Sequence, residues 1–416
     1  MRSKNKIVEL LSLAGLLLYL GAVLFGTSGP QWPQKLEDVS DITMSNPVNQ
    51  VVFSTIFILS FFSVLPHYKK LLYWLNREKF IVFFLLWCGI TIFWAIDPVV
   101  AFKRYFQYLT TSIVFISFLI NFKDEKIILK ILTVILSIYL FVTLIVVLTV
   151  PQATDPSFNT WRGLHPTKNN LGQTAGLCVI FFFTMLLRKN ELIKKITLSF
   201  FLVIALILLF GSFSMTNVLL ITIFTVLFII FKSNKLFESL GIGNKTAYLI
   251  LGFVFILILS VLALGSDLYL KFFEFIGKDP TLTGRTEIWY LVLSQSYNEL
   301  ITGVGFQSFW IPEHLSKIML FKYWVPTQSH NGYVDIILET GIVGLFFFVV
   351  VIYHLLARMN FKNNQLWVFF IVYAILLNFS ESTFIRPHHF TNVFFYLSFW
   401  VVSFKKYFIN VSDISS

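Results

Sequence analysis

The sequence has very few charged residues: Asp, Glu, Lys and Arg together make up 13% of its 416 residues. Soluble domains average about 25% charged and about 45–50% apolar residues. In this chain 57% of the residues are hydrophobic, and 49 of them are phenylalanine. The composition therefore excludes a soluble domain. It indicates an all-α polytopic membrane protein, because helices satisfy their own backbone hydrogen bonds in lipid.

Cysteine and metal-ligand patterns are also scarce. The two cysteines, Cys88 and Cys178, both lie within apolar runs, which favours core residues over a disulfide or a metal site. The sequence has no His-x-x-x-His pair on an expected helix and no Asp-rich motif in an outer loop. We therefore expect no metal requirement and no cofactor.

Apolar runs recur along the whole chain and predict about 12 transmembrane helices. The first run follows Arg2, Lys4 and Lys6, and its length of about 19 residues exceeds that of a signal peptide. No clear Ala-x-Ala site follows it, so we expect a retained helix. The runs cover 8–26, 51–65, 80–96, 105–121, 127–150, 171–187, 196–211, 215–231, 247–264, 332–356, 366–379 and 390–404.

The net charge of +11 is a topology signal and does not indicate a nucleic-acid partner. With the N-terminus in the cytoplasm, the segments on that side hold 21 of the 32 Lys and Arg residues. Such an excess is the positive-inside pattern, and it places both termini in the cytoplasm. We therefore expect the lipid bilayer, and not a nucleic acid, to be a partner of this chain. The segments are 1–7, 66–79, 122–130, 188–195, 232–245, 358–364 and 405–416.

Length and polarity accumulate on the outer side. We expect a single membrane domain over 1–416, with a large outer loop at 265–331 that caps the bundle. Within this loop, 285–300 mixes apolar and charged residues in the manner of a helix lying in the membrane interface. The aromatic residues Trp310, Tyr323 and Trp324 suit the headgroup level.

Three polar clusters fall on this outer side, at 161–172, 283–289 and 329–345. They supply Arg162, Lys168 and Arg285, whose cationic groups can bind phosphate oxygens. They also supply His330, which titrates near neutral pH and can accept a proton from an attacking hydroxyl. Ionisable groups at membrane depth are costly, so their presence points to function. The set suits glycosyl transfer from a lipid diphosphate.

Simpler interpretations stand beside these. The outer arginines can bind lipid headgroups, and His165, His388 and His389 suit solvated loop positions. Asp335 and Glu339 lie four residues apart on one helical face, where they can form buried hydrogen bonds that fix packing. Gly341 and Gly344 suit close contact between helices. Under this interpretation the two carboxylates support the site rather than perform its chemistry.

The clusters, in this order on twelve helices, resemble the O-antigen ligase and O-antigen polymerase superfamily, including relatives that polymerise exopolysaccharide. In the first motif, 163–172, the matching residues are Lys168, Asn169, Leu171 and Gly172, while Thr167 replaces a histidine. The second is Gly284-Arg285 before Trp289, with Gly303 and Gly305 downstream. The third is met by His330, Asn331, Tyr333, Glu339, Gly341 and Gly344, and Ser380-Glu381-Ser382 resembles a further motif.

The resemblance implies a GT-C-like membrane glycosyltransferase in a bacterial cytoplasmic (inner) membrane, with its active site on the periplasmic or outer face. Its donor would be an undecaprenyl-diphosphate-linked glycan and its acceptor a glycan or a lipid-linked sugar. His330 would activate the acceptor hydroxyl and Arg285 would hold the diphosphate. The expected substrate-binding residues are Arg162, Lys168, Asn169, Asn331, Tyr333 and Glu339. Many members carry a second phosphate-binding arginine at the position of Met215, so this chain departs from the family there.

The motifs do not separate a polymerase from a ligase, which differ in their acceptor. The Ser380-Glu381-Ser382 segment favours the polymerase branch, including exopolysaccharide polymerisation. A flippase or transporter for lipid-linked oligosaccharide is the main alternative, and it predicts charges spread through the spans and helices broken at mid-depth. A scaffold without catalysis would leave His330 and Arg285 unexplained.

Overall fold

The computed structural model describes residues 2–30, 32, 46–155, 159–188, 191–232, 285–312, 314–315, 327–359, 361–387 and 389–409. These residues form two compact units. One combines Met1–Ile221 with Ser296–Ser416, and the other is Thr222–Gln295. The first unit contains His330, and the second contains Arg285. The single membrane domain over 1–416 stays a prediction.

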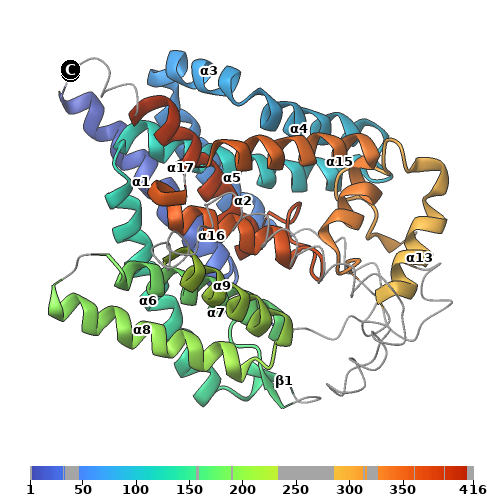
Figure 1. The fold of residues 1–416 in the computed structure, drawn as a ribbon. Coiled ribbons are helices and arrows are strands. Elements are labelled where there is room, and N and C mark those ends of the chain that lie inside the picture. Colours follow the sequence, from blue (N-terminus) through green and yellow to red (C-terminus); the bar gives the residue numbers. More distant parts are fainter. Residues whose placement is uncertain are drawn as a thin grey trace, which may run out of the picture. The chain divides into compact units, whose positions relative to one another are not determined.

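Most of the described residues are helical (Figure 1). The helices are α1 (Arg2–Phe25), α2 (Pro47–Val64), α3 (Tyr68–Arg77), α4 (Lys79–Ile90), α5 (Pro98–Phe122), α6 (Glu125–Thr149), α7 (Lys168–Leu186), α8 (Leu192–Gly211), α9 (Met215–Lys232), α13 (Arg285–Gln295), α15 (Gly332–Arg358), α16 (Phe361–Leu377) and α17 (Phe390–Phe404). Four 3-10 helices (Leu65–His67, Thr91–Trp94, Pro151–Ala153 and Tyr297–Glu299), a π-helix (Lys405–Ile409) and an antiparallel pair, β1 (Thr154–Asp155) with β2 (Thr160–Trp161), complete the described elements.

Local sequence signals set where the helices begin. Asn46 caps α2 and Asp97 caps α5, and each side chain accepts a hydrogen bond from a backbone N–H of the first turn. Pro47 and Pro98 occupy the first helical positions, where a missing N–H costs nothing. The chain therefore enters both helices at defined residues.

Small residues bring the N-terminal helices α1, α2 and α5 together. Ser117 donates to Ser12 at 3.0 Å and also hydrogen-bonds to Ser63. A Cβ added to Gly15 would lie 2.6 Å from the Ser60 hydroxyl. Small and hydroxyl-bearing residues are how helices associate in lipid, where apolar side chains gain nothing by leaving it.

Seven described helical segments are long and apolar enough to cross a membrane, and three shorter apolar segments accompany them. They fall on ten of the twelve predicted spans. The run at 390–404 forms α17, where every residue is buried, and the run at 247–264 lies outside the described residues. The chain is thus an all-α polytopic membrane protein. The count of twelve and the GT-C-like arrangement stay predictions.

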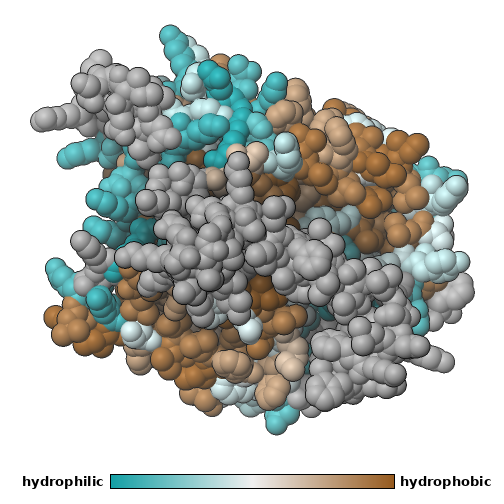
Figure 2. All heavy atoms as spheres, viewed as in Figure 1, coloured by the Kyte–Doolittle hydropathy of each residue, from teal (hydrophilic) through white to brown (hydrophobic). Residues whose placement is uncertain are grey.

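Lipid-facing surfaces are visible in the first unit. Figure 2 shows apolar side chains gathered over α4 and α15 and again over α8, with hydrophilic residues at the edge near α3. On α4, Leu86 is 54% exposed, and on α8, Ile193 is 79% exposed. Such large apolar exposure in a folded chain is what lipid contact requires. Cys88 and Cys178 are free and buried, which confirms that they are core residues.

Helix α15 is broken at Gly341, which has φ 73° and ψ 179°. Residues 300–305 lie against the break and complete its hydrogen bonds. The amides of Val304 and Gly305 donate to Leu338 and Glu339, while the amide of Ile342 donates to Leu300. Irregular backbone at membrane depth is tolerated where protein covers it, and here the same chain supplies the cover.

The two glycines of this region have different roles. At Gly344 an added Cβ would first meet the Thr340 hydroxyl of the same helix at 2.0 Å, and the Trp87 ring of α4 lies next at 3.3 Å, so the expected close contact with another helix is only part of its role. For Gly341 the expected contact with another helix was wrong. Its neighbour is the backbone of Ile301, in a non-helical segment.

The end of α15 remote from His330 is held by a buried ion pair. Arg358 Nη1 lies 3.0 Å from Glu78 Oε1, between α3 and α4. Glu78 is 3% exposed and also accepts a hydrogen bond from Ser403 at 2.8 Å. This pair lies at the opposite end of α15 from His330.

Candidate active site

His330 lies immediately before α15, in a left-handed backbone conformation with φ 56°. The next residue, Asn331, caps the helix, and its side chain accepts from the amides of Tyr333 at 3.0 Å and Val334 at 3.2 Å. Positive φ is uncommon for a residue other than glycine, and such strain concentrates at functional sites. The His330 side chain is 26% exposed.

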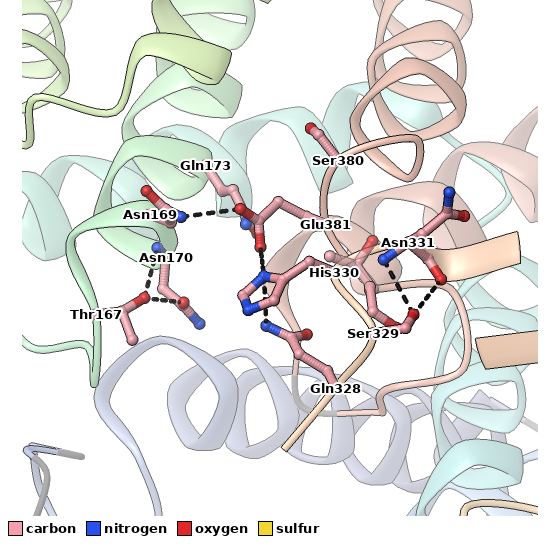
Figure 3. Close-up of polar contacts among 12 residues, drawn as sticks. Thr167, Asn169, Asn170, Gln173, Gln328, Ser329, His330, Asn331, Ser380 and Glu381 are labelled. Atoms are coloured by element: carbon pink, nitrogen blue, oxygen red, sulfur yellow. Dashed lines mark hydrogen bonds and ion pairs between the residues drawn. The ribbon is translucent and has the colours of Figure 1, made fainter. Parts of the chain in front are cut away.

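The Glu381 carboxylate faces the His330 ring. Its Oε2 lies 3.4 Å from His330 Nδ1, and its Oε1 accepts a hydrogen bond of 2.9 Å from the Asn169 side chain (Figure 3). The backbone joins them further, because Gly332 N donates to the Glu381 carbonyl at 3.1 Å. Glu381 is 3% exposed. The site is therefore assembled from three separate segments of the sequence.

This contact orients the imidazole. Gln328 Nε2 also lies 3.4 Å from His330 Nδ1, and the two neighbours require opposite protonation of that nitrogen. We assign the proton to Nδ1, because a buried carboxylate accepts a hydrogen bond more strongly than an amide group donates one. Nε2 is then the unprotonated nitrogen. The pair resembles a carboxylate–histidine arrangement in which one ring nitrogen is held and the other accepts a proton.

Asn169 is itself held by the start of α9. Its Oδ1 accepts from the Ser214 hydroxyl at 3.2 Å, and Asn217 donates to Ser214 at 2.7 Å. Met215, where the resemblance leads one to expect a second arginine, follows directly and is 59% exposed. The Ser214 region therefore contacts the Glu381 carboxylate through Asn169.

The other expected substrate-binding residues make internal contacts. Tyr333 donates from its hydroxyl to the Ile375 carbonyl at 2.9 Å, and Arg162 donates from Nε to the Gln152 carbonyl at 2.7 Å. Lys168 is the first residue of α7 and is partly exposed. Asn331 caps α15. Their roles in binding stay predictions.

Asp335 and Glu339 are fully buried on one face of α15, as the spacing predicts. Arg386 binds both, with Nη2 2.9 Å from Asp335 Oδ2 and 3.3 Å from Glu339 Oε1. Burial alone would lower the pKa of Arg386, but the Glu339 and Asp335 carboxylates outweigh it and raise that pKa. This pairing agrees with a support role for the two carboxylates, and the substrate-binding role expected for Glu339 stays a prediction.

Arg285 is the first residue of α13, in the second unit. His330 belongs to the first unit, so the pairing of Arg285 with His330 stays a prediction. Gly284 and His388, together with 265–284 of the large loop, lie outside the described residues. In the part that is described, no group of three His, Cys, Asp or Glu residues is suited to hold a metal ion.

Two further histidines lie near the site, and both are half-buried, so the interpretation of them as solvated loop residues holds only in part. His165 Nε2 lies 2.5 Å from the Tyr139 hydroxyl, and His389 Nε2 lies 3.4 Å from the Asn170 side chain. Burial lowers the pKa of His165 to about 3, with a further lowering from His389. For His389, burial outweighs the Glu381 carboxylate and lowers the pKa to about 4. Both rings are neutral at physiological pH.

These shifts predict that stability falls in acid. An unfolded histidine has a pKa near 6.5. Below about pH 6.5, His165 and His389 are therefore protonated in the unfolded chain but remain neutral in the folded protein, so acid favours unfolding. The unfolding temperature of the purified protein is expected to drop as the pH falls from 6.5 towards 4. The double variant His165→Gln/His389→Gln should show a shallower drop over the same range. Two parallel curves would contradict this assignment.

Comparison with known proteins agrees with the motifs. Residues 200–349 match the family model described as O-antigen ligase. The exopolysaccharide production protein ExoQ of Rhizobium meliloti (strain 1021) is 31% identical over 93 residues. That alignment spans only 21% of this chain and 21% of the relative. The two findings confirm the resemblance to the O-antigen ligase and O-antigen polymerase superfamily.

Proposed function

We propose that the chain is a membrane glycosyltransferase. Its motifs resemble those of the O-antigen ligase and polymerase superfamily, and residues 200–349 match the family model described as O-antigen ligase. The enzyme moves a glycan from undecaprenyl diphosphate onto the hydroxyl of an acceptor sugar. The reaction needs no metal, and it takes place at the outer face of a bacterial cytoplasmic membrane. The observation that carries this proposal is the contact between His330 and Glu381.

The geometry suits base catalysis. Glu381 holds the Nδ1 proton of His330, which leaves Nε2 to take the proton of the acceptor hydroxyl. The acceptor oxygen then bonds to the anomeric carbon as the bond from that carbon to the diphosphate oxygen breaks. The lipid diphosphate leaves with the electron pair. A neighbouring carboxylate stabilises the imidazolium that forms, as in other base-assisted transfers.

The leaving diphosphate needs cationic partners, and Arg285 is the proposed one. Guanidinium groups bind phosphate through two parallel hydrogen bonds, and charge that develops on a leaving group is stabilised by groups already in place. Arg162 and Lys168 are the proposed additional contacts, since Met215 offers no charge. The acceptor is a glycan or a lipid-linked sugar. The name of the relative ExoQ, an exopolysaccharide production protein, supports the polymerase branch.

Replacing Arg285 should weaken donor binding and turnover together. For Arg285→Ala we expect kcat/KM to fall about 10–100-fold, since a hydrogen bond to a charged group contributes about 1.5–3 kcal/mol. Arg285→Lys should recover little, because an ammonium lacks the fork of the guanidinium. Steady-state rates with the lipid-linked donor measure both. Arg77→Ala is the matched control, since Arg77 lies over the Tyr73 ring in α3. Equal rates in the Arg285 variants and the wild type would remove Arg285 from the site.

A lipid-linked oligosaccharide flippase is the second candidate, and one observation favours it. The break of α15 at Gly341 is the kind of feature that transporters place at a substrate site. In this chain, however, residues 300–305 fill the break with backbone hydrogen bonds. The His330–Glu381 pair has no evident use in a flippase.

One assay separates the two candidates. Purified protein is reconstituted in liposomes with an undecaprenyl-diphosphate oligosaccharide, without ATP and with a metal chelator. A glycosyltransferase releases free undecaprenyl diphosphate and forms a longer glycan. If the lipid only crosses the bilayer with its glycosidic linkage intact, the enzyme proposal fails and the flippase proposal takes its place.

A further inference from the structure

A buried network of charges lies beside the His330–Glu381 pair but shares no atom with it. Its centre is Arg386, which binds Asp335 and Glu339 through one guanidinium nitrogen. The Glu339 carboxylate also accepts a hydrogen bond of 2.8 Å from the backbone amide of Gln307, and Arg104 donates to the backbone carbonyl of the same residue. The network thus joins α5, α15, the segment after 300 and the loop that carries Glu381.

This network is important because α15 is broken at Gly341. The break divides α15 into a first half-helix, 332–340, and a longer second part, 342–358. In an unbroken helix, continuous backbone hydrogen bonds would fix the orientation of the first turns and of His330 just before them. The first half-helix instead depends on contacts from outside for its orientation. Asp335 and Glu339, its two buried carboxylates, both lie on Arg386.

Asp335 carries this contact to the segment that holds His330. Its Oδ1 accepts from the Ser329 amide at 3.2 Å and from the Trp310 indole at 3.3 Å. The Ser329 hydroxyl donates in turn to the Asn331 carbonyl at 2.8 Å. His330 lies between these two residues in its left-handed conformation. Arg386 binds the other oxygen of Asp335, so it fixes the carboxylate that fixes the Ser329 backbone.

Arg386 acts on Glu381 as well, because both belong to the connection between α16 and α17. The Ser382 hydroxyl donates to Asp335 Oδ2, the same oxygen that Arg386 binds. The Arg386 guanidinium thereby adds a side-chain link between the two segments whose side chains form the pair at 3.4 Å, beside the backbone bond from Gly332 to the Glu381 carbonyl. A planar guanidinium suits such bridging, whereas an ammonium is a point charge.

We propose that Arg386 is a positioning residue for the transfer: through Asp335 it docks the half-helix 332–340 against the Glu381 loop and so sets His330 opposite Glu381. The proposal rests on the proposed function. Arg386 does not contact the reacting atoms in this arrangement. Its removal should therefore lower kcat and leave the KM for the donor little changed.

The chain offers a matched control in Arg358, which pairs with buried Glu78 at 3.0 Å near the far end of the same helix. Arg386→Gln, Arg386→Lys and Arg358→Gln are purified as full chains and reconstituted in liposomes with the undecaprenyl-diphosphate oligosaccharide. Rates are expressed per folded molecule, from the monodisperse fraction in size-exclusion chromatography. Breaking either buried pair should reduce the yield of folded protein to a similar extent.

We expect Arg386→Gln to lose about 10²-fold in kcat, because a displacement of about 1 Å in a catalytic group has this effect. Arg386→Lys should be intermediate, and Arg358→Gln should keep the wild-type kcat. Equal kcat losses in Arg386→Gln and Arg358→Gln, or no loss in Arg386→Gln, would overturn the proposal. If Arg386→Gln does not fold, Arg386→Lys decides, and a wild-type kcat in it counts against the proposal. Wild-type turnover in His330→Ala would instead reject the proposed function itself.

Discussion

Replacing His330 with alanine is expected to lower kcat by about 10²–10⁴-fold, the usual contribution of a positioned general base. The acceptor hydroxyl has a pKa far above neutrality and must lose its proton as it attacks. Without an imidazole at this position, the proton passes to bulk water. The donor diphosphate does not depend on His330, so donor binding should survive. A change in kcat with little change in donor affinity is the signature of a group used in the transition state.

The measurement is turnover of the lipid-linked donor, combined with equilibrium binding of the donor to the same preparation. Glu381→Gln should reduce kcat less than His330→Ala, because it removes the charge that orients the ring but leaves the base in place. His354→Gln is the matched control, since His354 lies near the far end of α15. If His330→Ala keeps its rate, or if His354→Gln loses as much, His330 is not the base.

The sequence predicts much of the fold because hydropathy reports burial in lipid directly. Ten of the apolar runs coincide with described apolar helical segments, seven of which are long enough to cross a membrane. It also predicts His330, whose place before an apolar helix and beside an asparagine is unusual in a membrane protein. Glu381 entered only as part of a motif, because it lies 51 residues from His330 and no periodicity links the two. An acidic residue in a short connection between apolar runs was the available signal.

The sequence indicates two other features of the structure less clearly, namely the role of Arg386 and the break in α15. Arg386 is a basic residue on the predicted outer side, where the positive-inside rule expects few, and this indicates a buried partner. The break in α15 has no signal in hydropathy, because apolar residues continue on both sides of Gly341 and glycine is common in membrane helices. It depends instead on a contact with 300–305, which are remote in sequence. Contacts of this kind arise from tertiary packing, and a single sequence does not encode them locally.

That break underlies the second large effect, which is expected for Gly341→Ala. At φ 73° and ψ 179° the backbone occupies a region that is open almost solely to glycine, and another residue there costs about 1–3 kcal/mol. A steric conflict adds to this. An added Cβ would lie 2.1 Å from the Ile301 carbonyl oxygen and 2.4 Å from its carbon. These are backbone atoms, and no side-chain rotation relieves the contact.

Relief of that conflict requires residues 300–305 to withdraw from the break. The amides and carbonyls now paired between 300–305 and 338–343 would then lack partners in a region from which water is excluded. Each unsatisfied group in lipid costs several kcal/mol. We therefore expect Gly341→Ala to leave little folded protein, as measured by the monodisperse peak after extraction in detergent.

Two other glycines separate the causes. Gly21 lies within α1, and no described residue comes within 4 Å of an added Cβ, so Gly21→Ala should match or exceed the wild type in stability. Gly29 has φ 95° and likewise no described atom within 4 Å of an added Cβ, so Gly29→Ala should lose only the cost of the backbone conformation, about 1–2 kcal/mol. The expected order of unfolding temperatures is Gly21→Ala, then Gly29→Ala, then Gly341→Ala. A Gly341→Ala protein as stable as Gly29→Ala would mean that 300–305 do not occupy the break. The half-helix 332–340, which follows His330, would then be held by Arg386 without the backbone contacts from 300–305.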